Sequence, residues 1–198
     1  QEVIREFAES SGIPVINALT DAYHPCQVLS DLLTVIEHKG SLENLKIAWV
    51  GDGNNMAQSW INAAGALGFE LHLACPEGYF PDAQILSRAA QKPDAGITLD
   101  TDPVAAVKDA DVVNTDVWAS MGQEAEQEAR KKIFEPFQVN DVLLANAAKD
   151  VIVLHCLPAH RGEEISEAVL EGPRSVVWDQ SENKLHMHKA ILDILIND

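Results

Sequence analysis

The sequence predicts an α/β fold in which helices cover both faces of a parallel β-sheet. Short apolar segments alternate with longer amphipathic segments along most of the chain. Apolar residues run almost without interruption through the short segments, which is typical of strands buried on both faces. Gly, Pro, Asp and Asn occupy the junctions, where turns and helix caps are expected. This alternation predicts a Rossmann-like sheet whose ligands bind beyond the carboxyl ends of the strands.

The predicted strands are short and rich in β-branched residues. The first, "LKIAWVG", runs into a glycine turn, and the fifth, "VIVLHCL", stops at a proline. The six predicted strands span residues 45–51, 70–75, 96–100, 111–117, 151–157 and 175–180.

The predicted helices between these strands carry start and stop signals. The first has a helical spacing of apolar residues and ends at a glycine. Pro81 and the pair Asp102–Pro103 mark the starts of the next two, and the last is a charged surface helix. The four predicted helices span residues 55–68, 81–92, 102–110 and 124–137.

Segments at both ends lie outside this unit. Residues 1–20 predict one helix and a short strand, "IPVINAL", at 13–19. The segment 25–38 predicts a helix with one apolar face. That face consists of Leu29, Leu32, Leu33 and Ile36. The last helix, 182–196, is so apolar that we expect it to pack against this domain or against another one.

The composition describes a globular chain with a strongly acidic surface. It has 198 residues, 46% of them apolar, and a formal net charge of −17. No basic stripe and no apolar run of roughly 20 residues is present, so we expect neither nucleic-acid binding nor a membrane span. Three cysteines without a C-x-x-C pair predict neither disulfides nor a thiolate zinc site, and favour a cytoplasmic location. The chain opens in a helical pattern without Met or a signal peptide, so we expect residues upstream.

The turn "GDGNN" at 51–55 joins a strand to a helix. Glycines permit a tight turn, and a helix N-terminus binds anions or polar groups. Met56 breaks the G-x-G-x-x-G pattern, so a nicotinamide cofactor is disfavoured. A purely structural turn is the plain alternative. The side chains of Asn54 and Asn55 instead favour a polar ligand.

Two further segments place polar side chains beside a strand end or a helix start. In "DVWASMGQE", Asp116 projects from a strand end, and Ser120 and Met121 belong to a loop or, alternatively, to a helix start capped by Ser120. In "HPCQ", His24 and Gln27 offer hydrogen-bond donors at a helix N-terminus, although His24 alternatively serves only as a cap.

The segment "HCLP" ends the fifth strand with a thiol. Cys156 lies near predicted helix N-termini, which predicts a lowered thiol pKa. A nucleophilic cysteine needs a neighbouring imidazole base. Adjacent residues of a strand face opposite ways, so His155 is disfavoured as that base, while His24 or His160 can approach in space. The default role of Cys156 is that of a small buried hydrophobe.

In their order, "HPCQ", "GDGNNMAQS", "DVWASMGQE" and "HCLPAHRGEEI" resemble the aspartate/ornithine transcarbamoylase family. "SMG" and "HCLP" are specific to its ornithine-using members. The resemblance covers essentially all of the chain and implies four parts. These are 1–22, the end of a carbamoyl-phosphate domain; 23–40, a linking helix; 41–180, an L-ornithine-binding domain; and 181–198, a helix that returns to the first domain.

The resemblance implies that the δ-amine of L-ornithine attacks carbamoyl phosphate, giving L-citrulline and phosphate without a cofactor. His186 and His188 lie about 200° apart around the last helix and cannot bind one metal ion, so no metal site is expected. The resemblance assigns catalytic roles to Cys156, Asp116 and His24, with Cys156 orienting and polarising the substrates. It assigns carbamoyl phosphate binding to His24, Pro25, Cys26, Gln27, Cys156, Leu157 and Lys184. It assigns ornithine binding to Asn55, Asp116, Ser120 and Met121.

Two departures from the family pattern concern the phosphate. The family's S-x-R-T-R segment does not occur in this chain, so we expect it upstream of Gln1. Lys184 stands where the family usually has Arg, and it lacks the planar fork that binds oxygens in pairs. We therefore expect weak carbamoyl phosphate binding and little turnover by these residues alone. The family's trimer or higher multiple forms mainly through the first domain.

Three alternatives stay open on the residues. One is a binding module that keeps affinity for ornithine without catalysis. Another is a transcarbamoylase for putrescine or N-acetylornithine, against which the "SMG" loop argues. The third is a nicotinamide oxidoreductase, which the broken glycine pattern disfavours.

Overall fold

The computed structural model describes residues 1–92, 96–119 and 127–197. Within these ranges the centre is a five-stranded parallel sheet with the order β3-β2-β1-β4-β5. The predicted Rossmann-like α/β fold is therefore confirmed. The strands are β1 (Lys46–Val50), β2 (Glu70–Ala74), β3 (Ile97–Asp100), β4 (Val112–Thr115) and β5 (Ile152–His155).

The side chains of the strands alternate between two apolar cores, one on each face of the sheet. Along β1, Ile47 and Trp49 belong to the first core, while Ala48 and Val50 belong to the second. All four are fully buried, because neither face of the sheet meets water. Burial of one large apolar side chain contributes about 1.5–3 kcal/mol, so both cores hold the sheet together.

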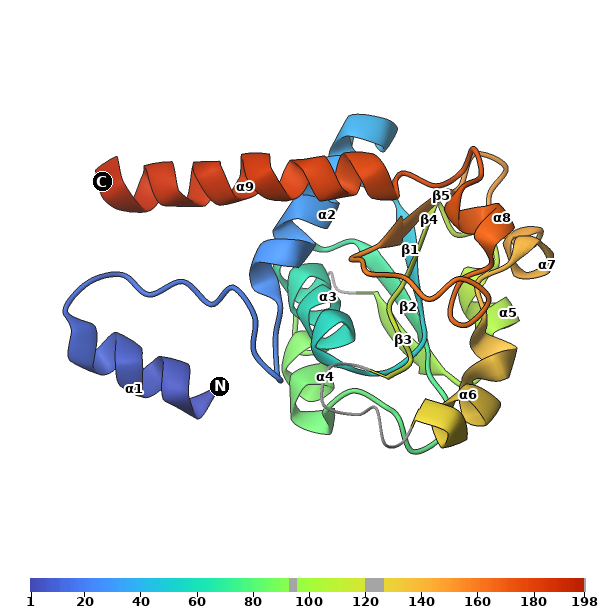
Figure 1. Cartoon of the computed structure of the whole chain (residues 1–198), viewed down its shortest axis with the longest axis horizontal. Helices are drawn as coiled ribbons and strands as arrows, with labels where there is room; N and C mark the ends of the chain where they lie inside the picture. Colours follow the sequence, from blue (N-terminus) through green and yellow to red (C-terminus); the bar gives the residue numbers. More distant parts are fainter. Residues whose placement is uncertain (93–95, 120–126, 198) are drawn as a thin grey trace.

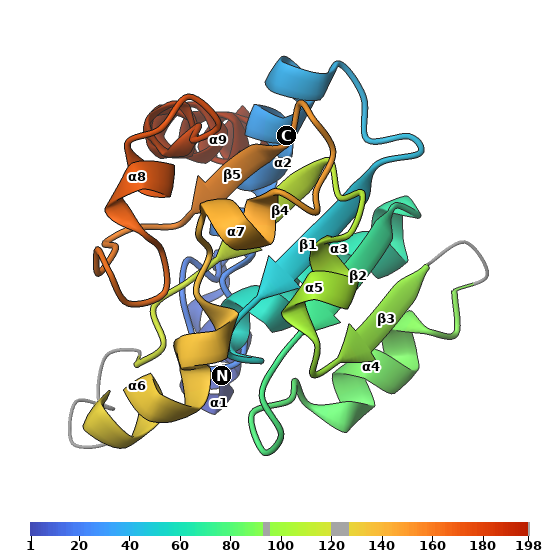
Figure 2. The same ribbon diagram turned by 90° about the vertical axis from the view of Figure 1, so that its right-hand side faces the viewer.

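Helices cover both faces of the sheet (Figure 2). The first core is closed by α2 (Pro25–Lys39), α3 (Asn55–Leu67) and α4 (Ala83–Ala89). The second core is closed by α5 (Pro103–Val107), α7 (Asp141–Leu144) and α8 (Glu167–Leu170). Asn54, Asp82 and Asp102 cap α3, α4 and α5 by accepting backbone N–H groups of the first turn, as was predicted for Asp102.

Two helices extend away from the sheet (Figure 1). α1 (Glu2–Ser11) is joined to α2 by an irregular segment and has no buried residue. α9 (Val177–Asn197) packs on α2 near its start and then projects past the sheet. Its exposed apolar side chains include Leu192, Ile194, Leu195 and Ile196. Among the described helices, none is both long enough and apolar enough to cross a membrane.

Two predicted strands are wrong, and two helices were not predicted. The segment 13–19 lies outside the sheet and forms no strand. The segment 175–180 mostly forms the start of α9, and only Ser175 pairs with Val153, in an isolated bridge. A short apolar run looks the same at a strand and at the first turn of a buried helix. α7 and α8 have four residues each, which is too short for an apolar repeat.

The buried face of α2 also differs from the predicted one. Leu29 and Ile36 are 42% and 41% exposed, whereas Val28 and Val35 join Leu32 in the core. A polar side of the helix is buried as well, because α9 contacts it. Its members are Gln27, Ser30, Asp31 and Thr34. α2 is therefore enclosed on two sides.

The turn after β1 depends on two glycines. Gly51 has a φ of 141°, which glycine adopts far more readily than other residues. Gly53 lies so close to the backbone of the next loop that a Cβ atom would be 2.2 Å from the Pro81 nitrogen. Its N–H also donates to the Tyr79 carbonyl at 2.9 Å. Contacts between backbone segments therefore fix this turn.

Gly53→Ala should lower the free energy of unfolding by about 2 kcal/mol or more, because the backbone must move to admit a Cβ atom. Gly40→Ala is the matched control. Gly40 has a φ of 82° but no atom within 4 Å of a Cβ, so we expect only about 1 kcal/mol of conformational strain there. Urea unfolding followed by circular dichroism measures both. Equal losses would contradict the steric explanation.

Candidate active site

A pocket of about 940 Å³ lies beyond the carboxyl ends of β1, β4 and β5. The chain runs from β1 outward through β2 and β3, and then returns to place β4 on the other side of β1. The segments that follow β1 and β4 therefore diverge, and ligands bind at such a switch point. Asn54, Asn55, Asp116, Cys156 and Leu157 line this pocket from three strand ends.

Asp116 accepts hydrogen bonds from groups on all three strand ends. The Cys156 thiol donates to its Oδ1 at 3.0 Å, and the Asn54 amide donates to its Oδ2 at 2.8 Å. The backbone N–H of Val117 also donates to Oδ1, at 2.8 Å. A nearly buried carboxylate needs such donors to offset the water that it has lost. Three of the four sequence motifs thus meet at one carboxylate.

The prediction of a lowered pKa for Cys156 is wrong. Burial raises the pKa of the Cys156 thiol well above its ordinary value, and the Asp116 carboxylate raises it further. Lys184 has the opposite effect, but it is the weaker one. Cys156 is therefore a neutral thiol at neutral pH, which can donate a hydrogen bond but is a poor nucleophile.

His155 contacts a different set of partners from Cys156, as strand alternation predicts. Its Nδ1 accepts the N–H of Leu157 at 2.9 Å, so Nε2 carries the proton and donates to Glu164 at 3.0 Å. Glu164 is fully buried and also accepts the N–H of His160 at 2.6 Å. These bonds hold the turn at Leu157, whose φ of 57° is uncommon for such a residue. Glu164 was not among the predicted site residues, and its place in "RGEE" is the one signal that the sequence carries.

His24 and Asn55 lie at another edge of the pocket. The backbone N–H of His24 donates to the Ser59 hydroxyl at 2.8 Å, and its side chain makes no capping bond to α2. His24 therefore occupies the N-cap position of α2 without capping it through its side chain. Burial lowers the pKa of the His24 imidazole, which is neutral at pH 7. Asn55 donates its Nδ2 to the Thr20 carbonyl at 2.9 Å, which leaves its amide oxygen for a ligand.

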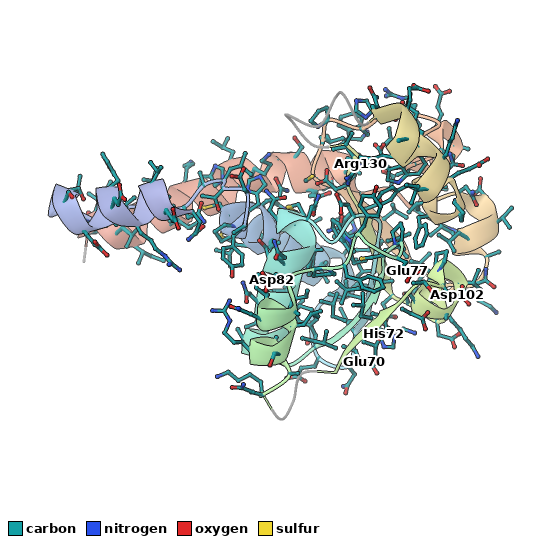
Figure 3. All side chains as sticks on the ribbon, turned by 90° about the horizontal axis from the view of Figure 1, so that it is seen from below. Glu70, His72, Glu77, Asp82, Asp102 and Arg130 are labelled. Atoms are coloured by element: carbon teal, nitrogen blue, oxygen red, sulfur yellow. The ribbon has the colours of Figure 1, made fainter. Side chains whose placement is uncertain are left out.

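A buried ion pair between Arg130 and Asp52 forms part of the pocket wall. Arg130 belongs to α6 (Gln127–Phe134), which precedes the 3-10 helix η2 (Glu135–Phe137), and Figure 3 labels it on the inner side of α6. Its guanidinium contacts Asp52 and the Trp118 carbonyl, and lies 4.6 Å from the Tyr79 ring centroid. Burial raises the pKa of Asp52 to about 6, although Arg130 opposes the rise. α6, which was predicted to be a charged surface helix, therefore has one buried charged side chain, that of Arg130.

Cys26 and Gln27 do not line the pocket. Cys26 donates to the Asn17 carbonyl at 3.5 Å, and Gln27 donates to Asp31 at 2.8 Å. Pro25 lines a separate apolar groove between α2 and α3. The predicted carbamoyl phosphate contacts of these three residues stay predictions.

Lys184 lies half-buried on α9 and influences the pKa of both His24 and Cys156. It is therefore near the pocket without lining it. Ser120 and Met121, which were predicted to bind ornithine, lie outside the described residues.

Two groups of side chains have the chemistry of metal ligands within the described ranges. They are Asp116, His155 and Cys156, and His160, Glu163 and Glu164, with ligand atoms within 4.8 Å of one another in each group. Asp116 already accepts three donors, and Glu163 pairs with Lys131 at 3.0 Å. Hydrogen bonds and ion pairs account for both arrangements, and the metal-free site stays a prediction.

These features define an α/β domain with a pocket at the switch point of its sheet, lined in part by polar side chains. The chain belongs to the aspartate/ornithine carbamoyltransferase family. The family model of the Asp/Orn binding domain matches residues 43–195, and that of the carbamoyl-P binding domain matches residues 1–37.

Similar proteins carry the name ornithine carbamoyltransferase. That of Syntrophus aciditrophicus is 65% identical over 194 residues, which are 98% of this chain and 64% of the relative. The structure from Pyrococcus furiosus has a TM-score of 0.94 at 49% identity, over 99% of this chain and 64% of that one. The structure of the anabolic ornithine carbamoyltransferase from Campylobacter jejuni has a TM-score of 0.94 at 44% identity, and the match covers 99% of this chain and 66% of that one. This chain thus spans 64% of the length of the curated relative and of the Pyrococcus chain.

Asp116→Asn should lower the pKa of Cys156, because it removes a negative charge that keeps the thiol protonated. At pH 8–9, alkylation of Cys156 by iodoacetamide should then be about threefold faster or more, because the thiolate fraction rises. Mass spectrometry of the Cys156 peptide measures the rate apart from the buried Cys26 and Cys75. Asp21→Asn, a change at the exposed rim of the pocket, should leave the rate unaltered. An unchanged rate in Asp116→Asn would refute the electrostatic role.

Proposed function

We propose that the protein is an ornithine carbamoyltransferase, which converts carbamoyl phosphate and L-ornithine to L-citrulline and phosphate. The observation that carries this proposal is the meeting of Cys156, Asp116 and Asn54 at the switch point, where His24 also lines the pocket. The names of the relatives support the same reaction. Arginine biosynthesis and the catabolic arginine deiminase route both use it, in opposite directions.

In this proposal ornithine binds with its amino-acid end at Asp116 and Asn55. The α-ammonium group is a cation, and Asp116 supplies a nearly buried negative charge for it. Asn55 presents its amide oxygen, because its Nδ2 already donates to Thr20. The resemblance assigns further ornithine contacts to Ser120 and Met121. The "SMG" segment favours free ornithine over putrescine, and the Asp116 carboxylate favours it over N-acetylornithine, whose α-nitrogen is neutral.

The reaction forms one C–N bond and breaks one C–O bond. The δ-nitrogen attacks the carbamoyl carbon, phosphate leaves with the electron pair of the broken bond, and the proton that the attacking nitrogen loses passes to the phosphate. The amine resembles that of Lys, with a pKa of about 10.4, and must lose its proton before it attacks. Neutral His24 polarises the carbamoyl oxygen, while the Cys156 thiol and the Leu157 carbonyl align the two nitrogens. Alignment and charge stabilisation are the main catalytic contributions.

The phosphate needs positive charge that the described pocket lining supplies only in part. Three acidic side chains line the pocket, namely those of Asp21, Asp52 and Asp116. The positive charge of Arg130 already pairs with Asp52. We infer that the phosphate contacts come from the carbamoyl-P binding domain, whose family model matches residues 1–37. Lys184 adds a point charge from α9.

The remaining assignments follow from this proposal. Residues 1–22 end the carbamoyl phosphate domain, 23–40 link it to the ornithine-binding domain at 41–180, and 181–198 return to it. The active protein is a homotrimer or a higher multiple of one, and it acts in the cytoplasm.

An assay of citrulline formation tests the proposal. It is run on the 198 residues and on the protein at its natural length. We expect citrulline from the natural-length protein and little from these residues alone. Higher turnover with putrescine or with N-acetylornithine than with ornithine would show that this other amine is the substrate. Calorimetric binding of ornithine without citrulline from either form would identify a non-catalytic binding module.

Cys156→Ser should lower kcat/KM about 10-fold to 100-fold without abolishing turnover, because a hydroxyl still donates to Asp116. Cys156→Ala should lower it further. Intact-protein mass spectrometry during turnover should show no carbamoyl adduct. A covalent adduct on Cys156 would overturn the orienting role.

A further inference from the structure

Asp31 is a fully buried carboxyl group that the proposed mechanism does not use. It lies on the polar side of α2. Its Oδ1 accepts the amide N–H groups of Gln27 at 2.8 Å and of Gln180 at 2.6 Å. Burying an ionisable group costs several kcal/mol, so a carboxyl at this place needs a reason beyond filling space.

Gln180 connects Asp31 to the strand end that carries the thiol. Its Oε1 accepts the backbone N–H of His155 at 2.9 Å, while its Nε2 donates to Asp31. His155 immediately precedes Cys156. Two consecutive hydrogen bonds therefore join Asp31 to the end of β5.

The same glutamine belongs to α9, one turn before Lys184. Asn183, beside Lys184, donates to Thr34 of α2 at 3.0 Å, so polar contacts hold the two helices together. α2 itself begins directly after His24. The elements that carry His24, Cys156 and Lys184 thus converge on Asp31.

The charge of Asp31 also acts on its surroundings. Burial raises its pKa to about 7, against the effect of Gln27, Gln180 and Lys184. The titratable groups that face it from neighbouring elements are Lys184 and Cys156, and Asp31 contributes to the raised pKa of the thiol. The buried side chain of Asn114, on β4, also faces the Asp31 carboxyl and lowers its pKa. Asn114 can donate to the ionised carboxylate or accept from the protonated acid.

We propose that Asp31 is a positioning residue of the carbamoyl phosphate side of the site, a role that rests on the proposed function. Through Gln180 it holds the end of β5, α9 and α2 in one arrangement. Once ionised, it also places a negative charge behind Cys156 and near Lys184.

Three substitutions separate these contributions. Asp31→Asn removes the charge but keeps an oxygen that can accept both hydrogen bonds. Asp31→Ala removes the charge and the hydrogen-bond acceptor. Gln180→Ala removes the hydrogen bonds that link Asp31 to β5, while Asp31 keeps its hydrogen bond from Gln27. If Asp31→Ala does not fold, Gln180→Ala tests the positioning role in its place. Asp179→Asn is the control, because Asp179 is an exposed residue of α9 that pairs with His38.

Steady-state kinetics at the natural length test the positioning. We expect Asp31→Ala and Gln180→Ala to raise the KM for carbamoyl phosphate about tenfold, with the KM for ornithine within about twofold. Asp31→Asn should bring the KM for carbamoyl phosphate back to within about threefold of the unaltered value. A KM for carbamoyl phosphate that stays within about twofold in Gln180→Ala would overturn the positioning role.

Alkylation of Cys156 by iodoacetamide between pH 7 and 10 tests the charge, and it needs no turnover. Asp31→Asn should react about threefold faster at a given pH, because an anion that favours the protonated thiol is gone. Asp179→Asn should match the unaltered protein. Coincident profiles for Asp31→Asn and the unaltered protein would overturn the electrostatic part. Absence of citrulline from the unaltered protein would instead refute the proposed function, while this comparison still reports on Asp31.

Discussion

Parallel pairing of β1 with β4 places the carboxyl ends of both strands at one edge of the sheet, and the contacts of the pocket depend on it. Ile47, Ala48 and Trp49 pair with Val112, Val113 and Asn114, so the turn after Val50 lies beside Asp116. β5 continues the same register on the far side of β4 and brings Cys156 to that carboxylate. A shift of one residue in either pairing would turn alternate side chains to the other face and separate these groups.

Much of the fold could be predicted because its signals are local. Continuous apolar runs identified all five strands, and Asp and Pro at helix starts identified α4 and α5, since both signals depend on neighbours in sequence. The start of α9 was mistaken for a strand because Val176 and Val177 are buried in opposite cores, as adjacent residues of a strand are. The polar buried side of α2 was missed because its partners belong to α9, far away in the sequence.

The sequence predicted several residues of the candidate site, but it did not predict their protonation or their buried charged partners. Asp116 and Cys156 come from motifs at strand ends. Strand alternation correctly gave His155 and Cys156 different hydrogen-bond partners, although a ring nitrogen of His155 lies within 4.8 Å of the Cys156 sulfur. The direction of the Cys156 pKa was wrong, because a helix N-terminus was expected to dominate and burial dominates instead. Glu164, Arg130 and Asp31 could not be selected from 31 acidic and 14 basic residues, because only the folded chain shows which of them lose contact with water.

The close approach of Gly53 to Phe80 and Pro81 fixes the backbone behind one side of the pocket. On the side of β1, this contact between main-chain segments lies behind the lining side chains of Asn54 and Asn55, and no rotamer change can widen or narrow it. On the side of β4 and β5, side chains form the surface through Asp116 and Cys156. Under the proposed function, substrate preference can therefore diverge through replacement of the lining side chains, while the backbone behind the β1 side stays constant. Protein engineering would vary those side chains and leave the glycine turn untouched.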